Sequence, residues 1–220
     1  THHDDIMLGF LPYIVHLVRL PDNKHYFSNL TSGFTSVTNA YIENILNNTL
    51  AFLANGKIQM IDYPDFFEKG YRLKTGKDVY HYLDRIASKT KEGQARGLSH
   101  RAVRALVEIY QLKSKTELVD RINKILIYLN GCYDGQKNIS DIQKLKGMIR
   151  EFEEELVWSH YGIRVKDVFH KRLGFYSGDI FTENPNLINL RLSLITEEVG
   201  ELTDAIKEHD FIEVRDALAD

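Results

Sequence analysis

Apolar residues recur at three- and four-residue spacing along most of this 220-residue chain, and no other feature constrains its fold as strongly. Only four prolines interrupt the pattern, which favours long helices over a fold rich in loops. The sequence therefore predicts an all-α fold, in which a helical N-terminal region is followed by a second helical core. The segments with helical spacing are residues 36–55, 77–88, 99–111, 115–129, 140–159, 164–173, 186–208 and 210 onward.

Breaks in this pattern divide the chain into four parts. They are a mostly helical region without an assigned role (residues 1–97), a basic helical hairpin (98–130), a charged connecting helix (138–162) and a C-terminal domain (163–220). A polar stretch with two glycines, residues 90–97, predicts a linker before the hairpin. We interpret the glutamates of the connecting helix as a solvated face and not as a site; they are Glu151, Glu153, Glu154 and Glu155.

The single cysteine, Cys132, excludes an internal disulfide and a cysteine-based zinc cluster, and it favours the cytoplasm as the compartment. The longest apolar stretch, Ile6 to Leu20, contains Pro12, His16 and Arg19 and falls short of the ~20 apolar residues that a bilayer demands. We therefore expect no membrane partner, and we interpret this stretch as a core helix or as two elements bent at Pro12. A formal net charge of −3 indicates no particular class of partner.

Carboxylates concentrate near the end of the sequence. Residues 186–220 carry nine acidic and three basic side chains, a net charge of −6. Glu198 and Glu201 are three residues apart and share one face of a predicted helix, and Glu213 and Asp216 repeat that spacing on the next. If the two helices fold back on each other, two pairs of carboxylates can face one another.

Two interpretations of this acidic group stay open. Like charges packed together need a counter-ion, and a set of oxygen ligands favours Mg²⁺, Mn²⁺ or Ca²⁺. Acidic residues on helices are also common on plain solvated surfaces. Asp210 and Glu213 fit an N-capping box, which would give Glu213 a structural role.

The ordered series over residues 165–220 resembles the MazG-like, all-α nucleoside triphosphate pyrophosphohydrolases, whose motif is ExxE, a spacer and then ExxD. The series covers about a quarter of the chain and reads Glu198-Val-Gly-Glu201, eleven residues, then Glu213-Val-Arg-Asp216. Its flanks also match, with VFHKRLG at 168–174, LRLSLITEE at 190–198 and DALAD at 216–220. The resemblance implies a four-helix core, so we expect a domain truncated at its C-terminus: either its fourth helix lies beyond Asp220, or this copy is a remnant with a structural role.

The resemblance implies hydrolysis of a nucleoside triphosphate to a monophosphate and pyrophosphate, with Mg²⁺ or Mn²⁺ as cofactor. Carried over to this chain, the metal ligands are Glu198, Glu201, Glu213 and Asp216, of which the first two are also catalytic, and the auxiliary acids are Glu197 and Asp220. The substrate-binding residues would be Phe169, His170 and Lys171 on the preceding helix, together with Arg191. Because the helices from Leu190 onward leave apolar residues uncovered, we expect either a second subunit of a homo-oligomer or the fourth helix to cover them.

The basic hairpin predicts a different activity. Residues 86–125 carry nine basic and four acidic side chains, and the stretch from 99 to 128 resembles the helix–extension–helix modules of SAP and Rho-N-terminal type. The resemblance implies binding of nucleic acid, with candidate contacts at Arg101, Arg104, Lys113, Lys115 and Arg121. In this alternative the MazG-like part serves dimerisation or assembly. The basic residues of the hairpin could also serve only solubility. The third interpretation of the whole chain is a purely structural assembly protein.

Overall fold

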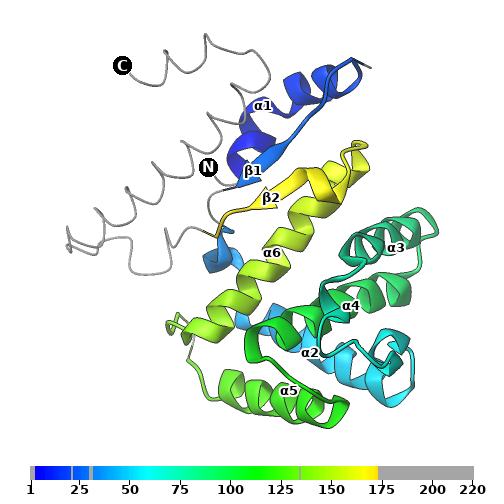
Figure 1. Cartoon of the computed structure of the whole chain (residues 1–220). Coiled ribbons are helices and arrows are strands. Elements are labelled where there is room, and N and C mark those ends of the chain that lie inside the picture. The colour runs from blue at the N-terminus through cyan, green and yellow to red at the C-terminus, as the bar shows by residue number, and fades with distance from the viewer. Residues whose placement is uncertain (1–2, 21, 30–31, 134, 173–220) are drawn as a thin grey trace. The chain divides into compact units, whose positions relative to one another are not determined.

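The computed structural model describes residues 3–20, 22–29, 32–133 and 135–172, and the predicted elements after residue 172 lie outside this part (Figure 1). The described residues are mostly helical, so the predicted all-α class is confirmed. Their helices are α1 (His3–Val18), α2 (Asn39–Ala54), α3 (Thr75–Ala87), α4 (Lys91–Tyr110), α5 (Lys115–Asn130) and α6 (Ser140–His160). Short 3₁₀ turns occur at Phe34–Ser36, Gln59–Asp62, Gly70–Arg72 and Val165–Asp167, and the strands are β1 (Phe27–Asn29) and β2 (Val168–His170).

Local sequence chemistry sets the ends of these helices. The Thr38 side chain accepts a hydrogen bond from the backbone N–H of Tyr41 (3.1 Å) and caps α2. At the start of α5, Ser114 Oγ accepts from the Glu117 N–H (3.2 Å), and the Glu117 carboxylate accepts from the backbone N–H of Lys113 (2.8 Å). These paired bonds satisfy amide groups that a helix leaves free at its first turn.

Four helices share the main hydrophobic core. Leu46 of α2, Leu106 of α4, Leu118 of α5 and Ile149 of α6 are fully buried in one cluster. α4 lies between its neighbours and packs mainly against α2 and α3. The basic helix pair is therefore part of a common core and not a separate module.

The predicted linker over residues 90–97 is wrong. Thr90 precedes α4, and the residues from Lys91 onward form its first two turns. The domain boundary placed after residue 97 falls inside this helix. Two glycines in a polar stretch indicated a flexible connection, but both are helical because α4 packs closely on α3 at these positions.

The predicted helix over residues 164–173 is also wrong. The segment forms a 3₁₀ turn and then β2, which pairs in parallel with β1 so that Phe27 is opposite Val168 and Asn29 is opposite His170. Phe27 also stacks on Trp158 of α6, with ring centroids 4.0 Å apart. Residues on α1 and both strands thus form a second, smaller core at the C-terminal end of α6 (Figure 1).

The apolar stretch near the N-terminus forms one helix, α1, with Pro12 inside it. Among the described helices, none is long and apolar enough to cross a membrane.

Candidate functional site

A cleft of about 340 Å³ opens between α3, α4 and the segment that follows α2. Basic side chains, imidazoles and glycines make up most of its lining. The residues that decide its chemistry are Lys57, His81, Arg85, Gly93, Arg96 and His100.

Helical spacing explains why these side chains meet. His81 and Arg85 are four residues apart on α3, and Arg96 and His100 are four apart on α4, so each pair lies on one helix face. Gly93 lets the two helices approach, because a Cβ at this position would overlap Cγ and Cδ of Arg85. The Arg85 side chain therefore crosses directly over α4 and reaches the cleft.

The cleft retains positive charge. Lys57 is paired with Glu92, whose pKa is lowered mainly by Lys57 and to a smaller extent by Arg96. Arg85 and Arg96 form no ion pair with any residue that the structure describes, although both are half-buried. Burial lowers the pKa of His100, which keeps this imidazole neutral near pH 7. The two arginines therefore carry the charge that a ligand would meet.

Arg104 holds the wall of the cleft in place. Its Nε donates a hydrogen bond to Asp78 Oδ2 (2.7 Å), and its Nη1 donates to the carbonyl oxygens of Tyr71 and Leu73 (both 2.9 Å). Asp78 and Arg104 are only 4% and 8% exposed. This ion pair connects the start of α3 to α4. The carboxylate of Asp78 is bonded to Arg104, so it is not available to a ligand in the cleft. Arg104, a predicted contact to nucleic acid, is therefore buried and engaged by Asp78.

A second charged cluster is buried at the C-terminal end of α6. Arg101 Nη1 donates to Glu155 Oε1 (3.2 Å), and its Nη2 pairs with the other oxygen of the same carboxylate. His170 lies between two glutamates, with Nδ1 3.4 Å from Glu154 Oε2 and Nε2 3.4 Å from Glu155 Oε1. Trp158 Nε1 donates to Glu154 Oε1 (2.9 Å).

Burial of this cluster corrects the interpretation of its glutamates. Glu151, Glu154 and Glu155 are 4%, 1% and 6% exposed, so the interpretation of these glutamates as a solvated face is wrong. Arg101, another predicted contact to nucleic acid, is 8% exposed and engaged by Glu155. Carboxylates can be buried here because a cation from α4 and an imidazole from β2 neutralise them.

The cluster shifts the pKa values of its members in opposite directions. Burial by itself raises the pKa of Glu155, but Arg101 and His170 together bring it below its ordinary value. Burial raises the pKa of Glu154 despite the nearby His170. Burial by itself lowers the pKa of His170, but the glutamates around it, Glu155 and Glu151 foremost, raise it above its ordinary value.

These shifts predict how stability depends on pH. A histidine whose pKa is raised on folding stabilises the protein fully below its unfolded pKa of about 6.5, and this contribution is lost as the pH rises through the folded pKa. We expect the free energy of unfolding, from urea titrations followed by circular dichroism, to fall above about pH 6.5. The variant His170→Gln should show a flatter profile in this window.

His100 provides the matched control, because its pKa is lowered by burial. Its contribution is lost as the pH falls below about 6.5, so His100→Gln should flatten the acidic side of the profile and leave the alkaline side unchanged. An unchanged alkaline slope in His170→Gln would contradict the assignment of His170.

The residues predicted to contact a nucleotide do not share one face. Phe169 is 45% exposed and lies 6.4 Å from the ring of Tyr26, whereas His170 points into the buried cluster. Both lie on a strand and not on the predicted helix, so their side chains alternate between opposite sides. Lys171 is exposed.

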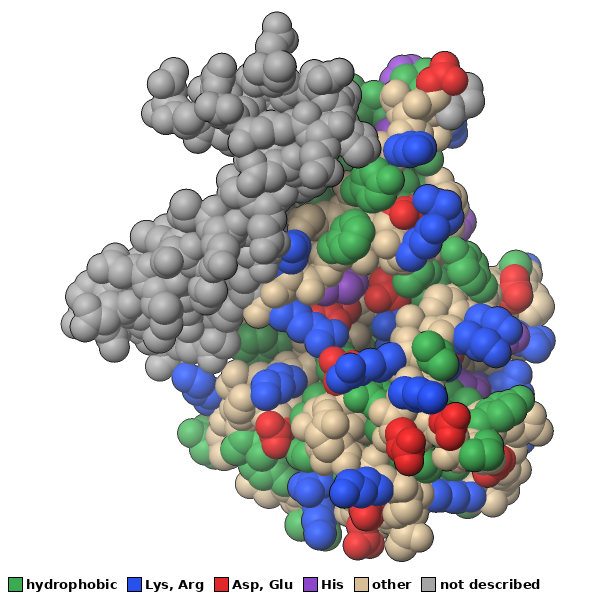
Figure 2. Space-filling view, viewed as in Figure 1, with side chains coloured by type: hydrophobic (Ala, Val, Ile, Leu, Met, Phe, Trp, Pro, Cys, Tyr) green, Lys and Arg blue, Asp and Glu red, His purple; other side chains and the backbone are tan. Residues whose placement is uncertain are grey.

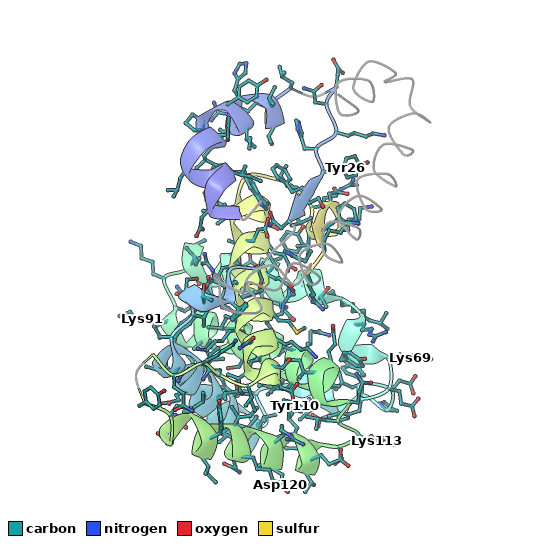
Figure 3. All side chains as sticks on the ribbon, turned by 90° about the vertical axis from the view of Figure 1, so that its left-hand side faces the viewer. Tyr26, Lys69, Lys91, Tyr110, Lys113 and Asp120 are labelled. Atoms are coloured by element: carbon teal, nitrogen blue, oxygen red, sulfur yellow. The ribbon has the colours of Figure 1, made fainter. Side chains whose placement is uncertain are left out.

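Three candidate contacts to nucleic acid remain near the surface. Lys113 and Lys115 are exposed at the start of α5, and Figure 3 shows Lys113 at the edge of the molecule. Arg121 is half-buried, with its guanidinium 4.2 Å from the ring centroid of Tyr110. Basic and acidic side chains are interspersed on the face shown in Figure 2, and they form no single stripe there.

The predicted metal ligands lie outside the described residues, as do the other predicted site residues of that region; these are Glu197, Glu198, Glu201, Glu213, Asp216, Asp220 and Arg191. Within the described ranges, no group of histidine, cysteine, aspartate and glutamate is arranged to hold a metal ion.

The cleft between α3 and α4 is not among the sites predicted from the sequence. A signal was present, because Gly93 and Gly97 are four apart and Arg96 and His100 are four apart in the same stretch. This spacing indicates a helix with a small-residue face beside a basic one. The polar composition had instead favoured a linker.

Comparisons with known proteins assign no family. No family model and no solved structure matches the chain. An uncharacterised protein of Acanthamoeba polyphaga mimivirus is 56% identical over 41 residues, which make up 19% of this chain and 16% of the viral protein. The chain thus aligns with about a sixth of the length of that relative.

Proposed function

We propose that the protein hydrolyses a nucleoside triphosphate to a monophosphate and pyrophosphate in the presence of Mg²⁺ or Mn²⁺. The observation that carries the proposal is the ordered carboxylate series of Glu198, Glu201, Glu213 and Asp216. The spacing within each pair and the matching flanks support it together, since paired acids alone are common on helices. The donors are all carboxylate oxygens, which fits a hard divalent cation.

In this reaction water adds to the α-phosphorus, the bond from the α-phosphorus to the bridging oxygen breaks, and pyrophosphate leaves. The cation, when bound, would lower the pKa of water and neutralise charge on the leaving pyrophosphate. The four carboxylates would hold that cation, and Glu197 and Asp220 would add negative charge beside them. Arg191 and Lys171 are the basic residues of this region that could bind phosphate oxygens.

The proposal is tested by pyrophosphate release from a panel of ribo- and deoxyribonucleoside triphosphates, with the full-length protein. We expect at least one triphosphate to yield equal amounts of monophosphate and pyrophosphate when Mg²⁺ or Mn²⁺ is supplied. Removal of the metal with a chelator should abolish release, and addition of excess Mn²⁺ should restore it. Release of orthophosphate instead, or no turnover of any triphosphate, would contradict the proposal.

No contact in the described part favours the nucleic-acid alternative. Two of its five candidate residues, Arg101 and Arg104, are buried in ion pairs. A salt-sensitive gel shift with DNA or RNA, combined with no turnover, would nevertheless favour it over hydrolysis.

A further inference from the structure

The cleft between α3 and α4 is separate in sequence from the carboxylate series, and the proposed hydrolysis gives it no role. We propose that this cleft binds the phosphate group of a small phosphorylated molecule. Its volume of about 340 Å³ lies at the lower end of the range of roughly 300–1,000 Å³ for small-molecule sites. An adjoining hollow of about 230 Å³ shares Arg85, Gly93 and Arg96 with it and adds Thr90 and Glu92.

Two arginines in the cleft would bind the phosphate group. Arg85 and Arg96 reach the cleft from different helices, and neither forms an ion pair with a carboxylate of the described residues; the nearby Glu92 is paired with Lys57. Partial burial removes some of the water around each guanidinium, so an unpaired arginine here is less well solvated than one on an open surface. A phosphate would supply the missing partner, and a planar guanidinium matches phosphate oxygens through two parallel hydrogen bonds.

The two glycines of α4 explain how Arg85 of α3 comes to lie beside Arg96. Glycine inside a helix is less favourable than alanine, so two glycines four residues apart require an explanation. Gly93 makes room for the Arg85 side chain, and a Cβ at Gly97 would lie 3.2 Å from Cβ of Tyr82. Both glycines therefore permit the close approach of α3 that brings Arg85 beside Arg96.

The rim of the cleft favours a small ligand over a nucleic-acid strand. Glu92 lies at the adjoining hollow and pairs with Lys57, so a negative charge stands beside the arginines. A phosphate backbone that continued through the adjoining hollow would meet this carboxylate, whereas Glu92 does not line the cleft in which one phosphate group can meet Arg85 and Arg96.

The experiment measures binding of inorganic pyrophosphate to the full-length protein by isothermal titration calorimetry, with a chelator present. Without a divalent cation the acidic series repels phosphate, and a dependence of the signal on Arg96 assigns it to the cleft. We expect wild type to bind, and Arg96→Gln to weaken binding at least about tenfold because a charge-assisted contact is lost. Arg19→Gln removes an exposed arginine outside the cleft and should bind like wild type.

A second variant tests geometry without changing any charge. Gly93→Ala should displace the Arg85 side chain and weaken binding by a similar factor, while improving the helix propensity of α4. Melting temperatures of all variants show whether lost binding reflects lost folding. The chelator removes the cation that the proposed hydrolysis requires, so pyrophosphate binding in its presence tests this proposal separately from the hydrolysis.

Three results would overturn the proposal. The first is no binding of pyrophosphate by wild type, and the second is equal binding by wild type, Arg96→Gln and Gly93→Ala. The third is binding of a single-stranded oligonucleotide that depends on Arg96 while pyrophosphate does not bind, which would assign the cleft to nucleic acid.

Discussion

Replacement of Arg104 with alanine is expected to lower the free energy of unfolding by about 3–5 kcal/mol. The substitution leaves the Asp78 carboxylate buried without its cation, at 4% exposure. It also removes the donor to the carbonyl oxygens of Tyr71 and Leu73, which hold the segment before α3. Urea denaturation followed by circular dichroism measures the loss.

A double variant separates the buried charge from the lost packing. Arg104→Met combined with Asp78→Leu removes both charges together, and we expect it to be more stable than Arg104→Ala because no ion remains buried alone. If Arg104→Ala unfolded at the same urea concentration as wild type, the structural role of the pair would be contradicted. A double variant that is less stable than the single one would contradict it too.

The substitution Glu201→Gln is expected to reduce pyrophosphate release at least about 100-fold, equivalent to about 2.7 kcal/mol in the barrier. The neutral amide keeps the shape of the side chain but binds a hard cation less well, so water activation and leaving-group neutralisation are both lost. The measurement is steady-state pyrophosphate release with the triphosphate that wild type prefers.

Glu208→Gln is the matched control, because Glu208 lies outside both carboxylate pairs of the series. It should retain the turnover of wild type, and both variants should melt at temperatures close to that of wild type. Equal turnover in Glu201→Gln and wild type would place any activity elsewhere in the protein.

The sequence by itself determined most of the described helices. The spacing of apolar residues predicted helices over 36–55, 77–88 and 140–159, and the structure has Asn39–Ala54, Thr75–Ala87 and Ser140–His160. Such predictions succeed because helical hydrogen bonds and caps join residues within four positions of each other.

The pairing of β1 with β2 was decided by tertiary structure alone. Val165 and Val168 are three residues apart, and this spacing fits a helix as well as it fits a turn followed by a strand. Phe27, distant in the sequence, pairs with Val168 and stacks on Trp158, and these contacts favour the strand.

The sequence pattern also could not predict which charged side chains are buried. Arg101 and Glu155 are 54 residues apart, and Arg104 and Asp78 are 26 apart, yet each pair is buried. A charged side chain on a helix has the same local signature whether it faces water or a partner from another helix. Its burial depends on that distant partner, because an ion leaves water only where an opposite charge replaces the lost hydration. For the same reason the basic cleft, whose walls come from three separate segments, became visible only in the folded chain.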